Sequence, residues 1–178
     1  MDTLIPLGND GTPRIVIGHN VSYDRIRVSE EYRLERSSTR YMDTMSLHIA
    51  YSGMTSSQRI MKQGEAKIEE ESRPKWFERT SANSLSDVYK FYCKPEKRLE
   101  KDVRDSFVKW TLEQLKQDIP TLLHYCAADV QATLQVAKVL IPKFLKACPH
   151  PATLSGLLTM STSYLPTNKC WDRYVVFL

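Results

Sequence analysis

The chain has 178 residues, of which 42% are hydrophobic, and its formal net charge is +4. This length suits one ordinary domain, and the apolar fraction is sufficient for a core, which argues against a disordered chain. No apolar run approaches the roughly 18 to 20 residues that a membrane helix needs, so a bilayer-spanning protein and a membrane partner are excluded. The basic charge is compatible with a polyanionic partner, but it is common among proteins that never bind nucleic acid.

Neither the N-terminus nor the cysteines indicate a targeted or disulfide-rich protein. Residues 1–10 contain two Asp and no Arg or Lys, which fits neither a secretory signal nor a mitochondrial transit peptide. The four cysteines are far apart and form no Cys-x-x-Cys motif, so no zinc knuckle or redox pair is indicated. We expect reduced thiols in an intracellular compartment.

The first third of the chain alternates short strands and helices. Residues 14–18 form a short apolar run that is rich in β-branched residues and ends at a glycine, which predicts a buried strand. Residues 22–32 then predict a helix capped by its first residue. Residues 40–42 predict a second strand, and Asp43 is expected to cap a helix that ends at Gly53. This order predicts part of an α/β sheet.

The middle of the chain is rich in charge. Residues 62–80 show no sustained periodicity and predict a surface insertion, whose end Trp76 and Phe77 are expected to pin to the body. Ser84 begins a Ser-x-x-Asp capping box before a short helix. Residues 94–105 predict a second charged connection.

The best-supported element is a long helix that follows a short helix over residues 111–117. Pro120 suits its first turn, and Pro142 is expected to interrupt it. Apolar residues recur at three- and four-residue steps, which predicts the buried face of this helix. That face is expected to comprise Leu123, Cys126, Val130, Leu134, Ala137 and Ile141. A further helix is predicted around residues 153–160.

Two acidic motifs stand out. Asn20 to Asp24 fits Asn-x-x-[Phe/Tyr]-Asp directly after the first strand, and Tyr125 to Asp129 fits Tyr-x-x-x-Asp on the long helix. Residues four apart on a helix lie about 40° apart on one face, so Tyr125 and Asp129 are expected to point into one cleft. These are the second and third motifs of the metal-dependent 3′→5′ exonucleases with four acidic ligands. An Asp-x-Glu, which would supply the other two ligands, occurs nowhere in the chain.

Each of these residues also has a plainer interpretation. Asp24 suits the positive end of a helix dipole, Asn20 could form a local turn bond instead of contacting substrate, and Tyr125 could be a half-buried aromatic. His124 creates a competing His-x-x-x-x-Asp with Asp129, although it lies about 140° around the helix, which favours Tyr125. The other histidines, interpreted as ordinary structural or surface residues, are His19, His48 and His150.

The chemistry explains why acidic residues would be required. Hydrolysis of a phosphodiester is served by two divalent ions about 4 Å apart, one activating water and the other stabilising the leaving oxygen. Mg²⁺ prefers oxygen ligands and keeps several waters, so a few carboxylates suffice. In this mechanism Asp129 would bind the ion that carries the attacking water, Asp24 would hold the second ion, and Tyr125 would orient the water.

Longer stretches around the motifs resemble the proofreading exonuclease domains of the mitochondrial DNA polymerase gamma catalytic subunits. The resemblance implies a helix-rich α/β fold of the ribonuclease-H-like (DnaQ-like) type and Mg²⁺-dependent removal of misincorporated 3′ nucleotides in mitochondria. It also implies catalytic and metal roles for Asp24 and Asp129, a catalytic role for Tyr125, and substrate contacts for Asn20 and Tyr23. The implied partners are the single-stranded 3′ end of primer DNA, the remainder of the polymerase catalytic subunit and an accessory subunit. The stretches are residues 15–25, 43–48, 83–85, 125–130, 148–151, 163–166 and 171–174.

The chain also departs from that family. It lacks the Asp-x-Glu of the first strand and the polymerase palm and fingers, so we expect a fragment, a truncated gene model or a splice product. Residues 1–148 would form a partial exonuclease domain, and residues 149–178 would begin the segment leading to the polymerase region. The incomplete central sheet would expose residues 15–17 at its edge, and the two missing carboxylates predict little or no activity for the isolated chain.

Two other functions remain open at this point. A ribonuclease of the same superfamily would act on RNA ends, but the polymerase-like segment 163–174 argues against it. A non-catalytic nucleic-acid-binding module would bind single strands in a salt-sensitive, metal-independent way. It would use Arg25, Arg27, Arg33, Arg36 and Arg40.

Overall fold

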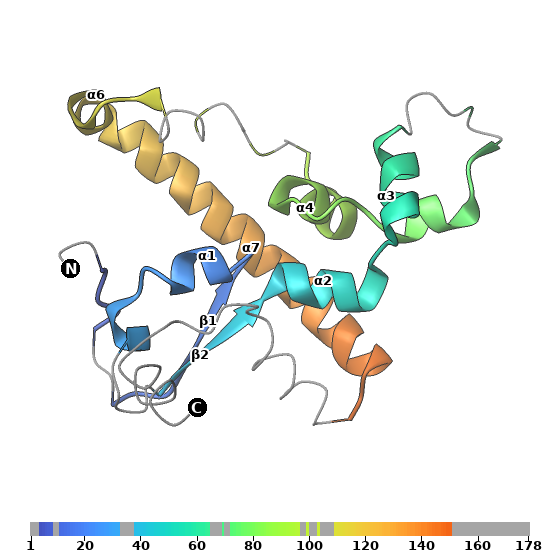
Figure 1. Ribbon diagram of the computed structural model, residues 1–178, viewed down its shortest axis with the longest axis horizontal. Helices are drawn as coiled ribbons and strands as arrows, with labels where there is room; N and C mark the ends of the chain where they lie inside the picture. Colours follow the sequence, from blue (N-terminus) through green and yellow to red (C-terminus); the bar gives the residue numbers. More distant parts are fainter. Residues whose placement is uncertain are drawn as a thin grey trace, which may run out of the picture.

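The computed structural model describes residues 4–8, 11–32, 38–64, 69, 72–96, 99, 103 and 109–150 (Figure 1). Within these ranges the sheet consists of two parallel strands, β1 (Arg14–Gly18) and β2 (Thr39–Asp43). The register sets Gly18 opposite Asp43, so the carboxyl ends of both strands meet at one edge. Both predicted strands are thereby confirmed as strands, but the predicted burial of the first is wrong, because no residue of β1 is fully buried and Ile15 is 55% exposed. The mixture of a parallel sheet with helices is that of an α/β protein.

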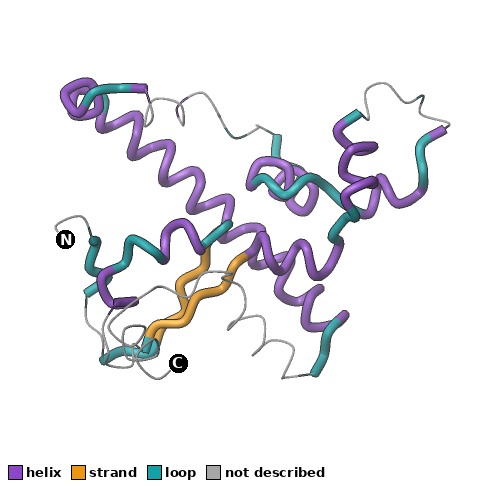
Figure 2. Tube along the Cα trace, viewed as in Figure 1, coloured by secondary structure: helices purple, strands orange, loops and turns teal. Residues whose placement is uncertain are grey.

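Helices make up most of the described chain, as Figure 2 shows. Between the strands lie the short α1 (Ser22–Arg25) and the 3-10 helix η1 (Ser29–Tyr32). The later helices are α2 (Thr44–Ser52), α3 (Ser56–Gln63), the 3-10 helix η4 (Lys75–Arg79), α4 (Leu85–Cys93), α6 (Leu112–Gln117) and α7 (Ile119–Ala147). No helix in the described ranges has the length and apolarity needed to cross a membrane.

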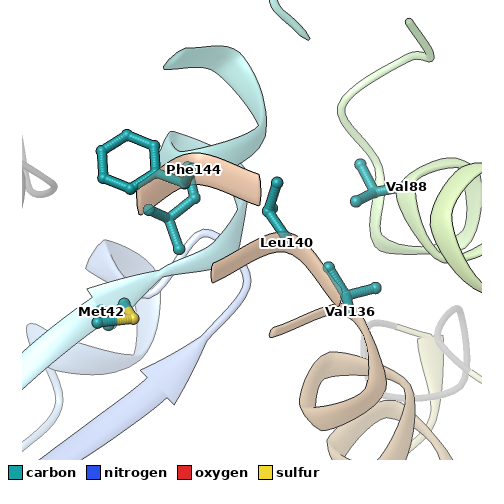
Figure 3. Packing of buried hydrophobic residues seen from close by; sticks show 6 residues of the cluster. Met42, Val88, Val136, Leu140 and Phe144 are labelled. Atoms are coloured by element: carbon teal, nitrogen blue, oxygen red, sulfur yellow. The ribbon is translucent and has the colours of Figure 1, made fainter. Parts of the chain in front are cut away.

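The core forms where α7 crosses the other elements. In Figure 1 this helix runs diagonally through the molecule, and it packs against β1, α2 and α4. Each fully buried apolar side chain stabilises the fold by about 1.5–3 kcal/mol, so this contact region dominates the stability. The cluster, shown in Figure 3, comprises Met42, Leu47, Val88, Val136, Leu140 and Phe144.

The predicted buried face of α7 is largely wrong. Leu123 and Val130 are 64% and 69% exposed, whereas Val136 and Leu140 are fully buried. The helix carries apolar residues on more than one side, so spacing alone fits several faces. Contact with β1, α2 and α4 selects the buried one.

Pro142 does not interrupt the long helix, which continues to Ala147. A proline inside a helix costs about 3 kcal/mol through a lost hydrogen bond and a steric clash. Here Leu140 and Phe144, on either side of Pro142, are both completely buried in the core. We attribute the survival of the last turns to this tertiary anchoring.

The single helix predicted over residues 22–32 is also wrong. Its N-cap is Val21 rather than Ser22, and the helix ends after Arg25. The N-terminal segment explains the break, because the backbone N–H of Ile5 donates to Arg27 O and the Ser29 N–H donates to Ile5 O, at 2.8 and 3.0 Å. A continuous helix could not form this parallel bridge.

Glu30 holds the N-terminal segment against the rest of the domain through hydrogen bonds. Its Oε1 accepts hydrogen bonds from the backbone N–H groups of Leu7 and Gly8 at 2.8 and 3.1 Å, and its Oε2 accepts from the Ser29 hydroxyl at 3.0 Å. Burial alone would raise the pKa of Glu30, but these hydrogen bonds to the carboxylate hold the pKa below its ordinary value.

We expect Glu30→Gln to weaken the acid sensitivity of the fold. Because the folded-state pKa of Glu30 lies below the unfolded value, the carboxylate contributes stability above about pH 4.5, and this stability is lost as the pH falls through the folded-state pKa. Urea unfolding measured from neutral pH to about pH 3 should show a smaller loss in the variant. The exposed Glu113→Gln serves as control, and a Glu30→Gln profile parallel to the parent would contradict this role.

Three other predicted helices are confirmed, and the structure describes only part of the remaining predicted segments. The helices predicted after Asp43, after Ser84 and over residues 111–117 are confirmed as α2, α4 and α6. The region 62–80 was predicted as a surface insertion without sustained periodicity, and its described part contains the end of α3 and all of η4. Phe77 is buried, as expected of a pinning residue. The helix predicted around residues 153–160 lies outside the described residues.

Candidate nuclease site

The first acidic motif begins with a tight turn at the end of β1. Asn20 has a positive φ of 62°, and its backbone N–H donates to Asp43 Oδ1 at 2.7 Å. Asp43 is 1% exposed, and it also accepts from the Met45 N–H at 3.0 Å and from the Ser46 hydroxyl at 2.9 Å. Asp43 is therefore the predicted helix cap, and it also fixes the turn that presents the motif.

His19 links the carboxyl edge of the sheet to the segment before α4 through hydrogen bonds. Its Nδ1 lies 2.9 Å from Thr44 Oγ1 and its Nε2 lies 2.7 Å from Asn83 O. A carbonyl only accepts, so Nε2 carries a proton. Burial lowers the pKa of His19, and the nearby Asp43 and Asp129 carboxylates oppose that shift. These bonds agree with the structural role expected of His19.

Asp24 and Tyr23 lie in α1 with exposed side chains. Partial desolvation by the surrounding chain raises the pKa of Asp24, Asp43 adds to this, and Arg27 opposes it. The guanidinium carbon of Arg27 lies 3.8 Å from the centre of the Tyr23 ring, a cation–π contact. One face of the Tyr23 ring is therefore covered by Arg27.

Tyr125 and Asp129 lie on α7, and both are half-buried. His124 is exposed on the same helix. The Asp129 carboxylate opposes the lowering of the His19 pKa, and α7 packs against β1. Asp43 acts electrostatically on both His19 and Asp24 at the edge where β1 ends.

The described residues fit only part of a metal site. Asp24 and Asp129 supply carboxylate oxygens, the donors that Mg²⁺ prefers. Asp43 is buried and already accepts three hydrogen bonds. Within the described ranges, no three His, Cys, Asp or Glu side chains gather closely enough to hold a metal ion. The donor type is right, but the donor number falls short.

Sequence reasoning located the two motifs but missed the connecting roles of His19 and Asp43. His19 gave no signal beyond its place beside Asn20. Asp43 was identified as a cap, yet its bond to the Asn20 N–H depends on the strand register, which joins residues 23 positions apart.

Comparison with known proteins identifies the family. Residues 1–144 match the family described as the DNA mitochondrial polymerase exonuclease domain. The chain is 47% identical over 174 residues to DNA polymerase subunit gamma-1, mitochondrial, of Drosophila melanogaster, covering 98% of this chain and 15% of that protein. It is 39% identical over 188 residues to DNA polymerase subunit gamma-1 of Xenopus laevis, covering 94% of this chain and 16% of that protein.

A fungal relative has a similar sequence identity and coverage. The chain is 41% identical over 187 residues to DNA polymerase gamma of Saccharomyces cerevisiae, covering 97% of this chain and 15% of that protein. The chain thus spans about 15% of the length of such relatives. The resemblance inferred from the motifs is confirmed, and the chain belongs to the family of DNA mitochondrial polymerase exonuclease domains.

Proposed function

We propose that this chain is the proofreading exonuclease portion of a mitochondrial DNA polymerase and serves mitochondrial DNA replication. The observation that carries the proposal is the family match over residues 1–144, together with two acidic motifs, one on α1 directly after β1 and one on α7, which packs against β1. The substrate is the single-stranded 3′ end of primer DNA. The partners are the rest of the polymerase catalytic subunit and an accessory subunit.

The proposed roles follow the chemistry of each side chain. Asp24 and Asp129 would provide this chain's carboxylate ligands to a two-ion Mg²⁺ site, and Tyr125, on the same helical face as Asp129, would orient the attacking water. When bound, Mg²⁺ supplies charge compensation for the phosphate and for the leaving 3′ oxygen. Asn20 and Tyr23 contact the terminal nucleotide, since both are exposed in or beside the motif.

We further propose a ribonuclease-H-like fold, with residues 1–148 as the exonuclease part and residues 149–178 leading toward the polymerase region. Two carboxylates cannot fully replace the four of the complete motif set, so the isolated chain should have little or no activity.

The arginine-based binding module receives less support. Arg25 forms a salt bridge with Glu31, Arg27 stacks on Tyr23, and Arg40 donates to the Thr39 carbonyl at 3.0 Å. These three arginines therefore interact with other residues of the same chain. The other two candidates, Arg33 and Arg36, lie outside the described residues.

The proposal is tested by replacing the matched region of the Drosophila relative with this chain. We expect this chimera to excise a mismatched 3′ nucleotide in the presence of Mg²⁺, and Asp129→Asn to slow excision at least about 100-fold. Loss of an outer-shell partner already costs a metal site about 10–100-fold, and a direct ligand should cost at least as much.

The matched control is Asp118→Asn, the same change just before α7 begins, which should leave excision intact. Primer extension by the chimera reports whether each variant is folded. Excision that survives Asp129→Asn unchanged would refute the assignment. Efficient excision by the isolated chain would refute its predicted inactivity.

A further inference from the structure

A pocket of about 560 Å³ opens at the end of α2 that is remote from the sheet. Its walls come from the α2–α3 junction, η4, α4 and the C-terminal part of α7, which approach one another at that side of the molecule in Figure 1. This volume suits a small ligand such as one nucleotide. The pocket includes neither Asp24 nor Asp129, so it is separate from the candidate nuclease site.

Four aromatic side chains from α2, η4 and α4 line the pocket, and together they are called the aromatic wall. They are Tyr51, Trp76, Phe91 and Tyr92. Trp76 packs on the buried Phe77 with ring centres 4.5 Å apart, and Phe91 meets Tyr92 edge to face at 4.8 Å. These contacts restrain the Trp76, Phe91 and Tyr92 rings, while all four aromatic residues remain partly exposed.

A hydrogen-bond network stiffens the wall formed by Ser52 and Tyr92. The Nδ1 of the fully buried His48 lies 3.0 Å from both the Tyr92 hydroxyl and Ser52 Oγ, and its Nε2 lies 3.3 Å from Ser81 O. Burial lowers the pKa of His48, so this support is uncharged at neutral pH. A wall fixed in this way binds a ligand with little ordering cost.

The charged side chains known to line the pocket are basic. Among the described lining residues are two cations, Arg79 and Lys143, and no acid. Both cations are exposed, and Lys143 Nζ lies 5.3 Å from the centre of the Tyr92 ring. The site therefore favours an anion that also carries a planar group. An acidic peptide would use the cations but leave the aromatic wall unused.

We propose that this pocket binds one nucleotide unit, with the base against the aromatic wall and the phosphate at Arg79 and Lys143. Stacking on aromatic side chains tolerates any base, and arginine and lysine are the usual phosphate partners. The binding needs no metal ion and does not rest on the nuclease function proposed above. It would give the domain a second contact for a nucleic-acid strand or for a free nucleotide.

The test measures binding of a fluorescein-labelled octathymidylate to the full chain by fluorescence anisotropy, in EDTA to exclude metal-dependent contacts. Lys143→Gln and Arg79→Gln should each weaken binding at least about fivefold, and Trp76→Ala should do the same. The matched controls are Lys146→Gln and Arg59→Gln, exposed residues outside the pocket, which should stay within about twofold of the parent.

Competition with thymidine 5′-monophosphate distinguishes the two sources of ligand. If thymidine 5′-monophosphate displaces the octamer at concentrations similar to those at which the octamer binds, a free nucleotide is a sufficient ligand. If it does not displace the octamer, the ligand is a nucleic-acid strand. The proposal is overturned if the pocket variants bind like the parent, or if the control variants lose as much affinity as the pocket variants. Circular dichroism checks folding, and the exposed Lys143 and Arg79 keep the test decisive if Trp76→Ala unfolds the chain.

Discussion

Phe144→Ala should lower the free energy of unfolding by about 3–5 kcal/mol, the range found for truncating a buried phenylalanine. Its side chain is completely buried in the cluster that joins α7 to β2, α2 and α4. The cluster draws its side chains from four elements, and a cavity inside such a core is not readily filled by local collapse. Urea unfolding followed by circular dichroism measures the loss.

A matched valine pair controls for general effects of truncating α7. Val136→Ala removes a fully buried side chain and should cost about 1–3 kcal/mol, whereas Val130→Ala removes one that is 69% exposed and should change stability by less than about 0.5 kcal/mol. The opposite ranking would favour the helix face expected from the sequence over the face found in the structure.

Sequence was sufficient where structure is determined locally. The strand at residues 14–18 is rich in β-branched residues and ends at a glycine, and Asp43 and Ser84 cap the helices that follow them. These signals act within a few residues. The unpredicted helix α3 also begins at a local signal, because Thr55 and Gln58 form a reciprocal capping box.

Sequence was insufficient where distant segments decide the outcome. Residues 22–32 favour a helix, but the bridge between Ile5 and Val28 divides it. Pro142 is a local helix breaker, but the core on either side preserves α7. In each case a tertiary contact outweighs the local preference, and the sequence pattern does not reveal that contact.

The same division holds for the functional sites. The motif residues Asn20, Asp24, Tyr125 and Asp129 were found from spacing, and the helical face shared by Tyr125 and Asp129 followed from geometry. The pocket could not be found in this way, because four separate segments contribute its lining residues. Its aromatic residues had the appearance of ordinary core positions.

The second large effect is expected at Asp43, where Asp43→Ala should cost about 2–4 kcal/mol of stability. The buried carboxylate accepts from the Asn20 and Met45 N–H groups and from the Ser46 hydroxyl. The loss of each of these hydrogen bonds costs about 0.5–1.5 kcal/mol, and the loss of the helix cap is included in this sum. Urea unfolding measures the effect.

Asp43→Asn separates hydrogen bonding from charge. The amide retains an acceptor oxygen for the two backbone N–H groups, so its loss should be smaller than that of Asp43→Ala. In the Drosophila chimera, Asp43→Ala should also slow excision, because the Asn20 turn that positions Asp24 loses its anchor, while primer extension persists. Stability equal to the parent in Asp43→Ala would show that the turn is held by other contacts, and the positioning role of Asp43 would then be abandoned.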